Sequence, residues 1–333
     1  MRILIKGFIL LICMISVYVM NMNHFSGKIQ YLLYEDMRTG TFRESSTAKF
    51  NVLNLEYPNL SLSALPMKAL VGRYYFLGEQ YDKALELLDQ AKNDNPFIMY
   101  SESIKADVFY RLGLRDSSLI YTKKAFNGIP NNERHFMELA KNYNGFNKYD
   151  SVDSIFKLVE KKYNSNIWKF YFTSVLVRDS IPDYAKRKAQ ESLEIWKNSK
   201  DPELKLSAIY VLYGIDNIQE AIKKVSIADS LFNEGSYDKA ALLYGEASEL
   251  NPSDYVYKEN AGISNFKYGY FDRAIPYFKY VIDSLNPKTG KSEFLLAQIY
   301  EKQKDYSNAC KYIRLSSQAN YSDAYRFIPI YCK

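Results

Sequence analysis

Apolar and polar residues alternate along most of this chain with the period of an amphipathic helix. The stretch 235–252 (GSYDKAALLYGEASELNP) shows this well, with apolar side chains three and four residues apart and a Gly and a Pro at its ends. The pattern also predicts helices at 168–177, 182–198 and 203–214, and one long helix over 216–235. The first 22 residues differ, because they are apolar almost without interruption.

The N-terminal segment predicts a membrane anchor. Arg2 and Lys6 precede a run of 14 apolar residues from Gly7 to Met20. The stretch reaches about 20 residues if Ile3 to Met22 is counted and Lys6 snorkels to the interface. Positive charge before the run places the N-terminus in the cytoplasm. We therefore predict a single-pass signal anchor or transmembrane helix over 1–22, with the bulk of the chain on the exported side, which in bacteria is the periplasm.

Three alternatives to the anchor stay open. A cleaved secretory signal requires small residues before the cut, and 21–25 (NMNHF) offers no A-x-A-like site. A lipoprotein signal resembles Leu10–Cys13 in outline, but Ile12 stands where a small residue should precede the cysteine. A buried core helix is the third. Beyond the anchor we expect a helix over 24–36 and an extended linker over 37–65, so that 23–64 forms a juxtamembrane helix and linker.

The chain repeats itself at intervals of 34 or 35 residues in two blocks. In the first block the corresponding positions are Gly72, Ala106 and Ala140; Tyr75, Phe109 and Tyr143; Ala84, Ser118 and Val152; and Ala91, Ala125 and Val159. In the second block they are Ala228, Gly262 and Ala297; Tyr237, Phe271 and Tyr306; and Ala240, Ala274 and Ala309. Small residues let paired helices approach closely, and aromatics are expected to fill the gap between one pair and the next. Gly235 and Gly269 are expected to end helices at positive φ.

This order of small, aromatic, turn-Gly, small, aromatic, small and Pro resembles the tetratricopeptide repeat (TPR) family over 65–166 and 221–323. The resemblance implies an all-α fold, a helical-hairpin repeat solenoid wound as a right-handed superhelix, behind an N-terminal transmembrane or signal helix. Ser118 and Val152 depart from the family's Ala, Asn164 departs from its Pro, and no copy carries the early Trp.

The repeats suggest a division into domains. Three repeats over 65–166 form block one, and three over 221–323 form block two. Residues 167–220, where the 34-residue register is lost, form a diverged helical junction, and 324–333 form a C-terminal cap. Near 199–220 the alternatives are an irregular junction and a continuous, degenerate solenoid.

Composition argues against nucleic-acid binding and catalysis. The formal net charge is +6, but Lys and Arg are spread along the chain with Asp and Glu between them. The two His lie far apart and no C-x-x-C pair occurs, so a structural zinc site is not expected. Thr289–Ser292 resembles the tail of a phosphate-binding loop, but Leu285 stands where its other glycine should be. We expect no enzyme, no cofactor and no metal.

Two smaller features allow more than one interpretation. Cys310 in the last repeat and Cys332 in the cap are expected to be buried thiols, with a disulfide as the alternative in an oxidising compartment. Asp-Ser-apolar triplets resemble an acceptor motif for O-glycosylation of exported bacterial proteins, and we interpret them instead as a helix-start preference of Asp and Ser. The triplets begin at Asp153, Asp179, Asp229 and Asp283.

In the TPR family the first helix of each pair lines the concave face. The resemblance therefore implies a partner-binding groove in block one made by Arg73, Phe76, Tyr100, Asp107, Tyr110, Arg111, Arg134 and Lys141, with Met137 and Asn144. The block-two equivalents are Asp229, Phe232, Glu259, Phe266, Lys267, Phe294, Gln298 and Glu301. Arg, Lys and Tyr suit an extended acidic peptide or a polar glycan, and the alternative for the aromatics is packing between helices.

A chaperone co-factor role is not expected from these residues, because the family's carboxylate clamp needs Lys and Asn where Ala69 and Arg73 stand. The leading hypothesis is a membrane-anchored scaffold that mediates protein–protein interaction on the exported side. The alternative is a glycan-binding accessory protein in cell-surface polysaccharide assembly or export, which rests on analogy of fold.

Overall fold

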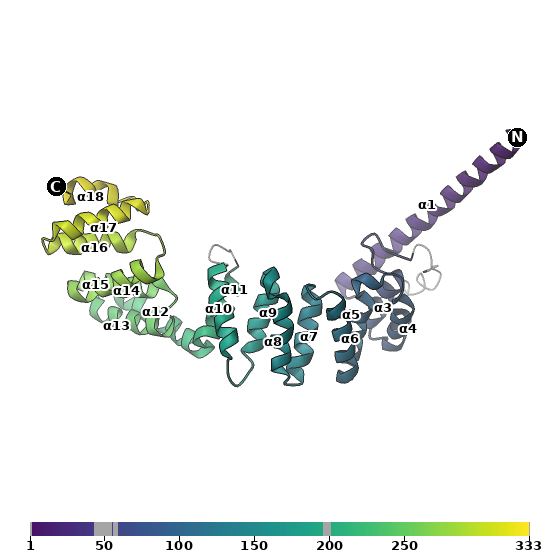
Figure 1. The fold of residues 1–333 in the computed structure, drawn as a ribbon, viewed down its shortest axis with the longest axis horizontal. Coiled ribbons are helices and arrows are strands. Elements are labelled where there is room, and N and C mark those ends of the chain that lie inside the picture. The colour runs from purple at the N-terminus through teal and green to yellow at the C-terminus, as the bar shows by residue number, and fades with distance from the viewer. Residues whose placement is uncertain (1, 43–54, 56–58, 196–200, 333) are drawn as a thin grey trace. The chain divides into compact units, whose positions relative to one another are not determined.

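The computed structural model describes residues 2–42, 55, 59–195 and 201–332, with side chains from Lys6 onward. Within these ranges the chain is helical, and an isolated bridge between Leu60 and Pro66 is the only strand-like pairing (Figure 1). The predicted all-α fold is confirmed. Most of the linker expected over 37–65 lies outside the described residues, although its first residues continue the N-terminal helix to Thr39.

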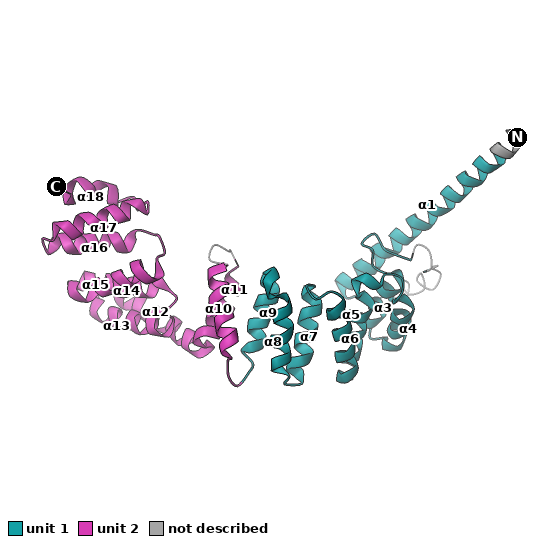
Figure 2. Cartoon of the chain, viewed as in Figure 1, with its two compact units in different colours: residues 1–178 teal, residues 179–333 magenta. Residues whose placement is uncertain are grey.

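The chain divides into two compact units, Met1–Arg178 and Asp179–Lys333 (Figure 2). Unit 1 contains α1, the helices up to α9 and two 3-10 turns. Their bounds are α1 Arg2–Thr39, α3 Met67–Leu77, α4 Tyr81–Ala91, η1 Pro96–Ile98, α5 Tyr100–Arg111, α6 Arg115–Gly128, α7 Glu133–Gly145, α8 Tyr149–Val159, η2 Glu160–Lys162 and α9 Ser165–Val175.

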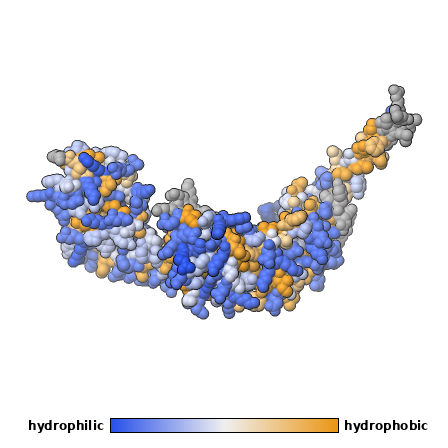
Figure 3. Space-filling model, viewed as in Figure 1, coloured by the Kyte–Doolittle hydropathy of each residue, from blue (hydrophilic) through white to orange (hydrophobic). Residues whose placement is uncertain are grey.

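Helix α1 has two different halves. Its apolar first half is exposed all round, with Phe8 64% and Met20 71% exposed, which contradicts a buried core helix there. Figure 3 shows this hydrophobic surface along α1. In the second half Ile29 and Leu33 are buried in the core that contains α3. The hydroxyl of Tyr74 donates to Asp36 Oδ2 at 3.2 Å, so the same continuous helix joins the apolar segment to the first repeat.

Unit 1 is built from helix pairs, α3 with α4, α5 with α6, and α7 with α8, each joined by three residues, at 78–80, 112–114 and 146–148. So short a turn makes the two helices antiparallel neighbours. The second helices begin at Tyr81, Arg115 and Tyr149, which keeps the 34-residue interval. A cluster of rings from α7, α8 and α9 continues the core, including Phe136, Phe156 and Trp168.

Small residues allow the helices of a pair to approach closely, as predicted. A Cβ added at Gly72 would lie 3.2 Å from the carbonyl oxygen of Ala84, and Ala84 itself is fully buried. Ser118, which departs from the repeat's Ala, is also buried and donates its hydroxyl to the carbonyl oxygen of Ala106 at 2.9 Å. The departure therefore keeps the close approach, because the extra polar atom is paired across the hairpin.

Unit 2 contains α10 to α18, with bounds α10 Asp183–Ile195, α11 Pro202–Tyr213, α12 Ile215–Asn233, α13 Tyr237–Leu250, α14 Tyr255–Tyr268, α15 Phe271–Tyr280, η3 Val281–Leu285 (a π-helical turn), α16 Lys291–Lys302, α17 Tyr306–Gln318 and α18 Ala324–Tyr331. The predicted long helix is α12. Gly235 and Gly269 follow α12 and α14 with φ of 82° and 95°, as predicted.

The prediction that the repeat aromatics fill the gap between successive pairs is wrong for Tyr237 and Phe271. Tyr237 and Phe271 are the first residues of α13 and α15, and their rings pack against the end of the preceding helix of the same pair. The ring centroids of Tyr237 and Phe232 are 5.1 Å apart, and those of Phe271 and Phe266 are 5.7 Å apart. These aromatics therefore stabilise the connection between the two helices of one hairpin. The last turn of the first helix and the first turn of the second helix face each other there.

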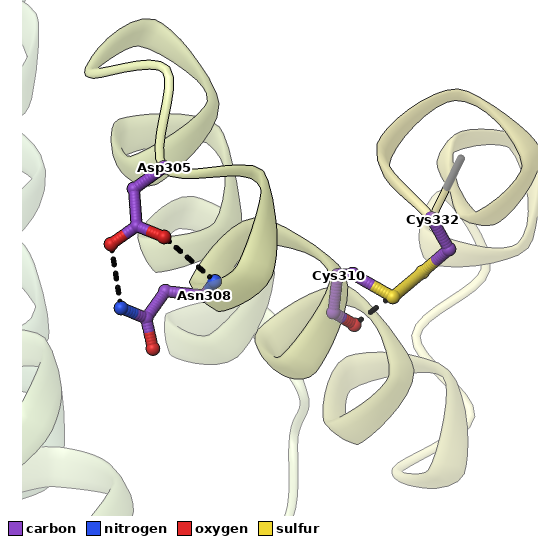
Figure 4. Close-up of a disulfide and its surroundings, with 4 residues drawn as sticks. All are labelled: Asp305, Asn308, Cys310 and Cys332. Atoms are coloured by element: carbon purple, nitrogen blue, oxygen red, sulfur yellow. Dashed lines mark hydrogen bonds between the residues drawn. A yellow bond between two sulfur atoms is a disulfide. The ribbon is translucent and has the colours of Figure 1, made fainter.

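The C-terminal helix α18 covers the last repeat and is held to it by a disulfide. Cys310 on α17 and Cys332 after α18 are bonded, with Cα atoms 4.7 Å apart (Figure 4). The expectation of two free thiols was wrong, because α18 folds back along α17 and brings together cysteines 22 residues apart. Beside them Asp305 caps α17 by accepting from the backbone N–H of Asn308 at 3.0 Å.

The helix-start interpretation of the Asp-Ser triplets is also wrong. Asp153 and Asp229 lie within α8 and α12, Asp283 lies in η3, and Asp179 precedes α10 by several residues. Two of these carboxylates have structural partners. Asp153 accepts from the hydroxyl of Tyr171 at 2.9 Å and pairs with Arg178 at 2.8 Å, and Asp229 accepts from the hydroxyl of Tyr244 at 2.5 Å.

Candidate binding surface on the first helices of unit 1

Six of the eight predicted block-one residues come together on α3, α5 and α7, the first helices of three successive pairs. We call this set the polar stripe, with Ser103 and Glu138 added because they bond directly to it. Its members are Arg73, Tyr100, Ser103, Asp107, Tyr110, Arg134, Glu138 and Lys141. The stripe exists because first helices stack side by side, so residues at matching helical positions in consecutive repeats become neighbours.

Arg134 connects the stripe. One guanidinium nitrogen lies 2.5 Å from Asp107 Oδ2 on α5, and another lies 2.5 Å from Glu138 Oε1 on its own helix. Glu138 also accepts from the hydroxyl of Ser103 on α5 at 2.9 Å. Towards α3, the guanidinium of Arg73 donates to the hydroxyl of Tyr100 at 3.3 Å. Each bond joins neighbouring helices or neighbouring turns, and charge-assisted bonds of this kind fix the register of adjacent repeats.

Burial raises the pKa values of the two carboxyl groups in the polar stripe. Burial raises the pKa of Glu138 above its ordinary value of 4.5, although the charge of Arg134 opposes the shift. Burial also raises the pKa of Asp107, against the opposing charges of Arg134, Lys141 and Arg73. Two carboxylates are thus held in a poorly solvated place by surrounding cations.

Tyr110 and Lys141 form the exposed end of the stripe. The ammonium group of Lys141 lies 4.4 Å from the ring centroid of Tyr110, and 37% of Tyr110 is exposed. The position of Tyr110 corresponds to that of Phe76 in the preceding repeat, whose ring contacts Tyr81 five residues later with centroids 6.2 Å apart. Arg115 stands five residues after Tyr110, so this ring has no aromatic at the start of the next helix to stack on. Tyr110 is therefore left at the surface.

The other predicted block-one residues have different surroundings. Phe76 is half-buried and packs against the core around α3. For this residue the structure therefore shows packing between helices, which was the alternative to a place in the groove. Arg111 is exposed at the end of α5, next to Tyr110 in sequence. Met137 and Asn144 are half-buried on α7.

Two members of the stripe were missed from the sequence, Ser103 and Glu138. A signal for both was present, because Glu138 is four residues after Arg134 and Ser103 is four residues before Asp107. Side chains four residues apart share one helix face, so the predicted residues already marked that face. The sequence could not predict that Ser103 of α5 bonds to Glu138 of α7, because the two residues lie on different helices.

In unit 2 the predicted aromatics lie in core clusters, which is the packing alternative. Phe232, Phe266 and Phe294 each contact buried residues, and Phe294 is only 7% exposed. Glu259 is also internal, since it accepts from the hydroxyl of Ser292 at 2.8 Å and pairs with Lys291 at 3.3 Å. Exposed or half-exposed side chains remain at Asp229, Lys267, Gln298 and Glu301.

The polar stripe carries three cations, Arg73, Arg134 and Lys141, against two carboxylates, and the exposed Arg111 follows Tyr110 in sequence. Its exposed ends are cationic or aromatic, and its carboxylates are largely occupied by Arg134. Among the described residues no group of three or more His, Cys, Asp or Glu is arranged to hold a metal ion. The arrangement suits contact with an extended, acidic chain.

One helix in the described part of the chain is long and apolar enough to cross a membrane. It is α1, over Lys6–Thr39, with a mean hydropathy of 1.7 in its most apolar window. A signal sequence near the N-terminus meets the same criteria of length and apolar composition, so α1 is a candidate membrane helix or signal.

No protein-family model matches the chain. One relative is a tetratricopeptide repeat and J domain-containing co-chaperone of Cryptococcus neoformans var. grubii, 32% identical over 108 residues. These residues are 32% of this chain and 20% of the relative, so the chain spans a small part of that protein.

Two solved tetratricopeptide repeat structures align along most of this chain, with low scores. A tetratricopeptide repeat protein from Parabacteroides merdae gives a TM-score of 0.34 at 13% identity, covering 93% of this chain and 100% of that one. The TPR2AB domain of yeast Sti1, in its complex with pHSP90, gives a TM-score of 0.32 at 15% identity, covering 79% of this chain and 95% of that one. TM-scores this low carry no inference about function. The TPR-like solenoid fold of this chain is shown by its own helix pairs, which recur every 34 or 35 residues.

Proposed function

We propose that this chain is a membrane-anchored, non-enzymatic scaffold that binds a partner protein through the polar stripe of unit 1. The observation that carries the proposal is the connected set of charged and aromatic side chains on α3, α5 and α7, partly open to solvent. Repeat arrays use such extended faces to bind long segments of other proteins. The surplus of cations favours an acidic segment as the ligand.

The proposal includes a topology and a domain organisation. The first half of α1 crosses the membrane with the N-terminus in the cytoplasm, because Arg2 and Lys6 precede its apolar run. The repeats then lie on the exported side, which is periplasmic in a bacterium, and a disulfide between Cys310 and Cys332 suits that oxidising side. The proposal also includes the predicted domain boundaries, which follow residues 22, 64, 166, 220 and 323. The glycan-binding alternative stays a hypothesis, since no contact here favours it.

Site-specific photocrosslinking in native membranes tests the partner site. A benzoylphenylalanine at Tyr110 of the full-length chain is expected to give one protein adduct, because that ring is exposed beside Lys141. The adduct should be lost when Lys141→Glu reverses the charge there. The matched control places the crosslinker at Lys124, an exposed lysine 4.9 Å from the ring centroid of Tyr121 on the second helix α6. Equal adducts at 110 and 124, or none at 110, would contradict the proposed site.

A further inference from the structure

Two apolar side chains stand out of the surface at one end of unit 1. Leu62 is 96% exposed and Phe97 is 84% exposed, more than any other large hydrophobic residue in the described ranges. Leu62 lies in the connection before α3, and Phe97 lies in η1, between α4 and α5. Neither belongs to a repeat face or to the polar stripe, so the proposed partner site does not account for them.

The loops that carry these side chains are fixed in place. The turn around Leu62 is closed by a 2.8 Å bond from Ser61 N–H to the carbonyl of Leu65, and by a 3.0 Å bond from Leu65 N–H to Ser61 Oγ. Asn95 Nδ2 donates to the carbonyl of Ala64 at 2.9 Å, which ties the Phe97 connection to the Leu62 turn. Hydrogen bonds therefore hold the loops that carry Leu62 and Phe97 and join them to each other.

This surface faces the same way as the apolar half of α1. The N–H of Leu62 donates to Gln30 Oε1 at 3.3 Å, and further along both helices Tyr74 of α3 bonds Asp36 of α1. Helices α1 and α3 thus run in the same direction where they pack. The beginning of α3, with the Leu62 turn, lies at the end from which the apolar segment of α1 extends.

The spacing along α1 fits a membrane interface. Phe25 is 45% exposed and is the last exposed apolar residue of α1 before the level of Gln30. Five residues of helix separate them, a rise of about 7.5 Å. The headgroup layer of a bilayer is about 5–7 Å thick on each side. The Gln30 side chain leans towards the N-terminus of α1, so Leu62, which bonds to it, lies nearer to Phe25 than the Gln30 backbone does. A hydrocarbon layer that ends between Met22, the predicted end of the anchor, and Phe25 therefore has its headgroups at the level of Leu62.

We propose that Leu62 and Phe97 insert into the headgroup layer of the membrane that α1 crosses, so that the first repeat of unit 1 rests on the bilayer surface. The occupant of this surface is lipid, because both side chains lie at the end of unit 1 from which the apolar half of α1 extends, where aromatic and aliphatic side chains enter the membrane interface. The proposal rests on the membrane anchor of the proposed function. It needs no anionic lipid, since apolar contact carries it.

Lipid-borne quenching in nanodiscs tests this contact. The full-length chain is placed in phosphatidylcholine nanodiscs containing a lipid with a nitroxide at the headgroup. In a Cys13→Ser background, single variants Leu62→Cys, Phe97→Cys and Leu114→Cys are labelled with a small fluorophore, leaving the disulfide intact. Leu114 is the matched control, because it is 52% exposed but follows the opposite end of α5, about 18 Å of helix away from Phe97. Native Cys13, which is exposed on α1, is labelled separately to report on the anchor.

Labels at 62 and 97 are expected to be quenched several-fold more than the label at 114. Equal quenching at 62, 97 and 114, with Cys13 quenched by a nitroxide on the acyl chain, would overturn the surface contact while leaving the anchor in place. Absence of quenching at Cys13 would overturn the anchor, and the surface contact with it. None of the three exposed positions contributes to the core, so each variant is expected to fold.

Discussion

Gly262 of α14 lies so close to α15 that a side chain does not fit without movement. A Cβ at this position would be 2.8 Å from Cε1 of Phe278, whose ring is fully buried. We expect Gly262→Ala to destabilise unit 2, because overpacking a core costs about 1–3 kcal/mol. The gain in helix propensity offsets about 1 kcal/mol of that cost.

Hydrogen exchange of the full-length chain measures this effect in the α14 and α15 amides. Gly27→Ala is the matched control, because Gly27 is helical and a Cβ there has nothing within 4 Å. Faster exchange is expected for Gly262→Ala alone. Unchanged or slower exchange in α14 and α15 would show that Phe278 can move aside.

Glu138 gives the polar stripe a pH-dependent contribution to stability. Since burial raises its pKa above 4.5 in the folded protein, the unfolded chain releases this proton first as pH rises. The stabilisation is fully present below pH 4.5 and is lost as pH rises through the folded-state pKa. The wild type should therefore lose stability relative to Glu138→Gln over that window, which thermal midpoints between pH 4 and pH 7 measure. Glu86→Gln on the exposed face of α4 serves as control, and an unchanging difference between wild type and Glu138→Gln would contradict the expectation.

At the scale of the helix, the hairpins explain which aromatic positions are exposed and which are packed. Where the second helix begins with Tyr81, Tyr237 or Phe271, the ring five residues earlier packs against it at a tilted or edge-on angle. Where it begins with Arg115, Tyr110 is exposed instead. The same repeat position thus has a packing role in one hairpin and a surface role in another, because its neighbour across the turn decides.

Helix α18 is expected to depend on its disulfide. It has only eight residues with Pro329 inside, which is too short to be stable without packing. Closing a loop of this length by a disulfide contributes about 3 kcal/mol. Reduction, or Cys310→Ser with Cys332→Ser, should therefore speed hydrogen exchange in α18 and leave α12 and α13 unchanged. Equal protection of α18 with and without the bond would mean that contacts with Phe294 and Tyr321 suffice.

For the whole molecule, the membrane tether is the property to test first. Deleting residues 1–22 from the full chain is expected to move it from the carbonate-resistant membrane fraction to the soluble fraction, because the exposed apolar half of α1 is removed. Intact mass of the wild-type protein from the same membranes tests whether the segment is retained. A mass lacking these residues would make the mature protein a free exported adaptor, and protease protection of the repeats in spheroplasts would reverse the assigned side.

The sequence by itself determined the helical class, the hairpin repeat and the apolar N-terminal segment, because periodicity and small-residue spacing are local properties of the chain. It also marked the face on which Arg73, Asp107 and Arg134 lie. Tertiary structure alone decided that Arg134 pairs with both Asp107 and Glu138, that Cys310 meets Cys332, and that Gln30 holds the Leu62 turn. These contacts join residues on different elements, and their distances depend on how the helices stack, which no local pattern of residues encodes.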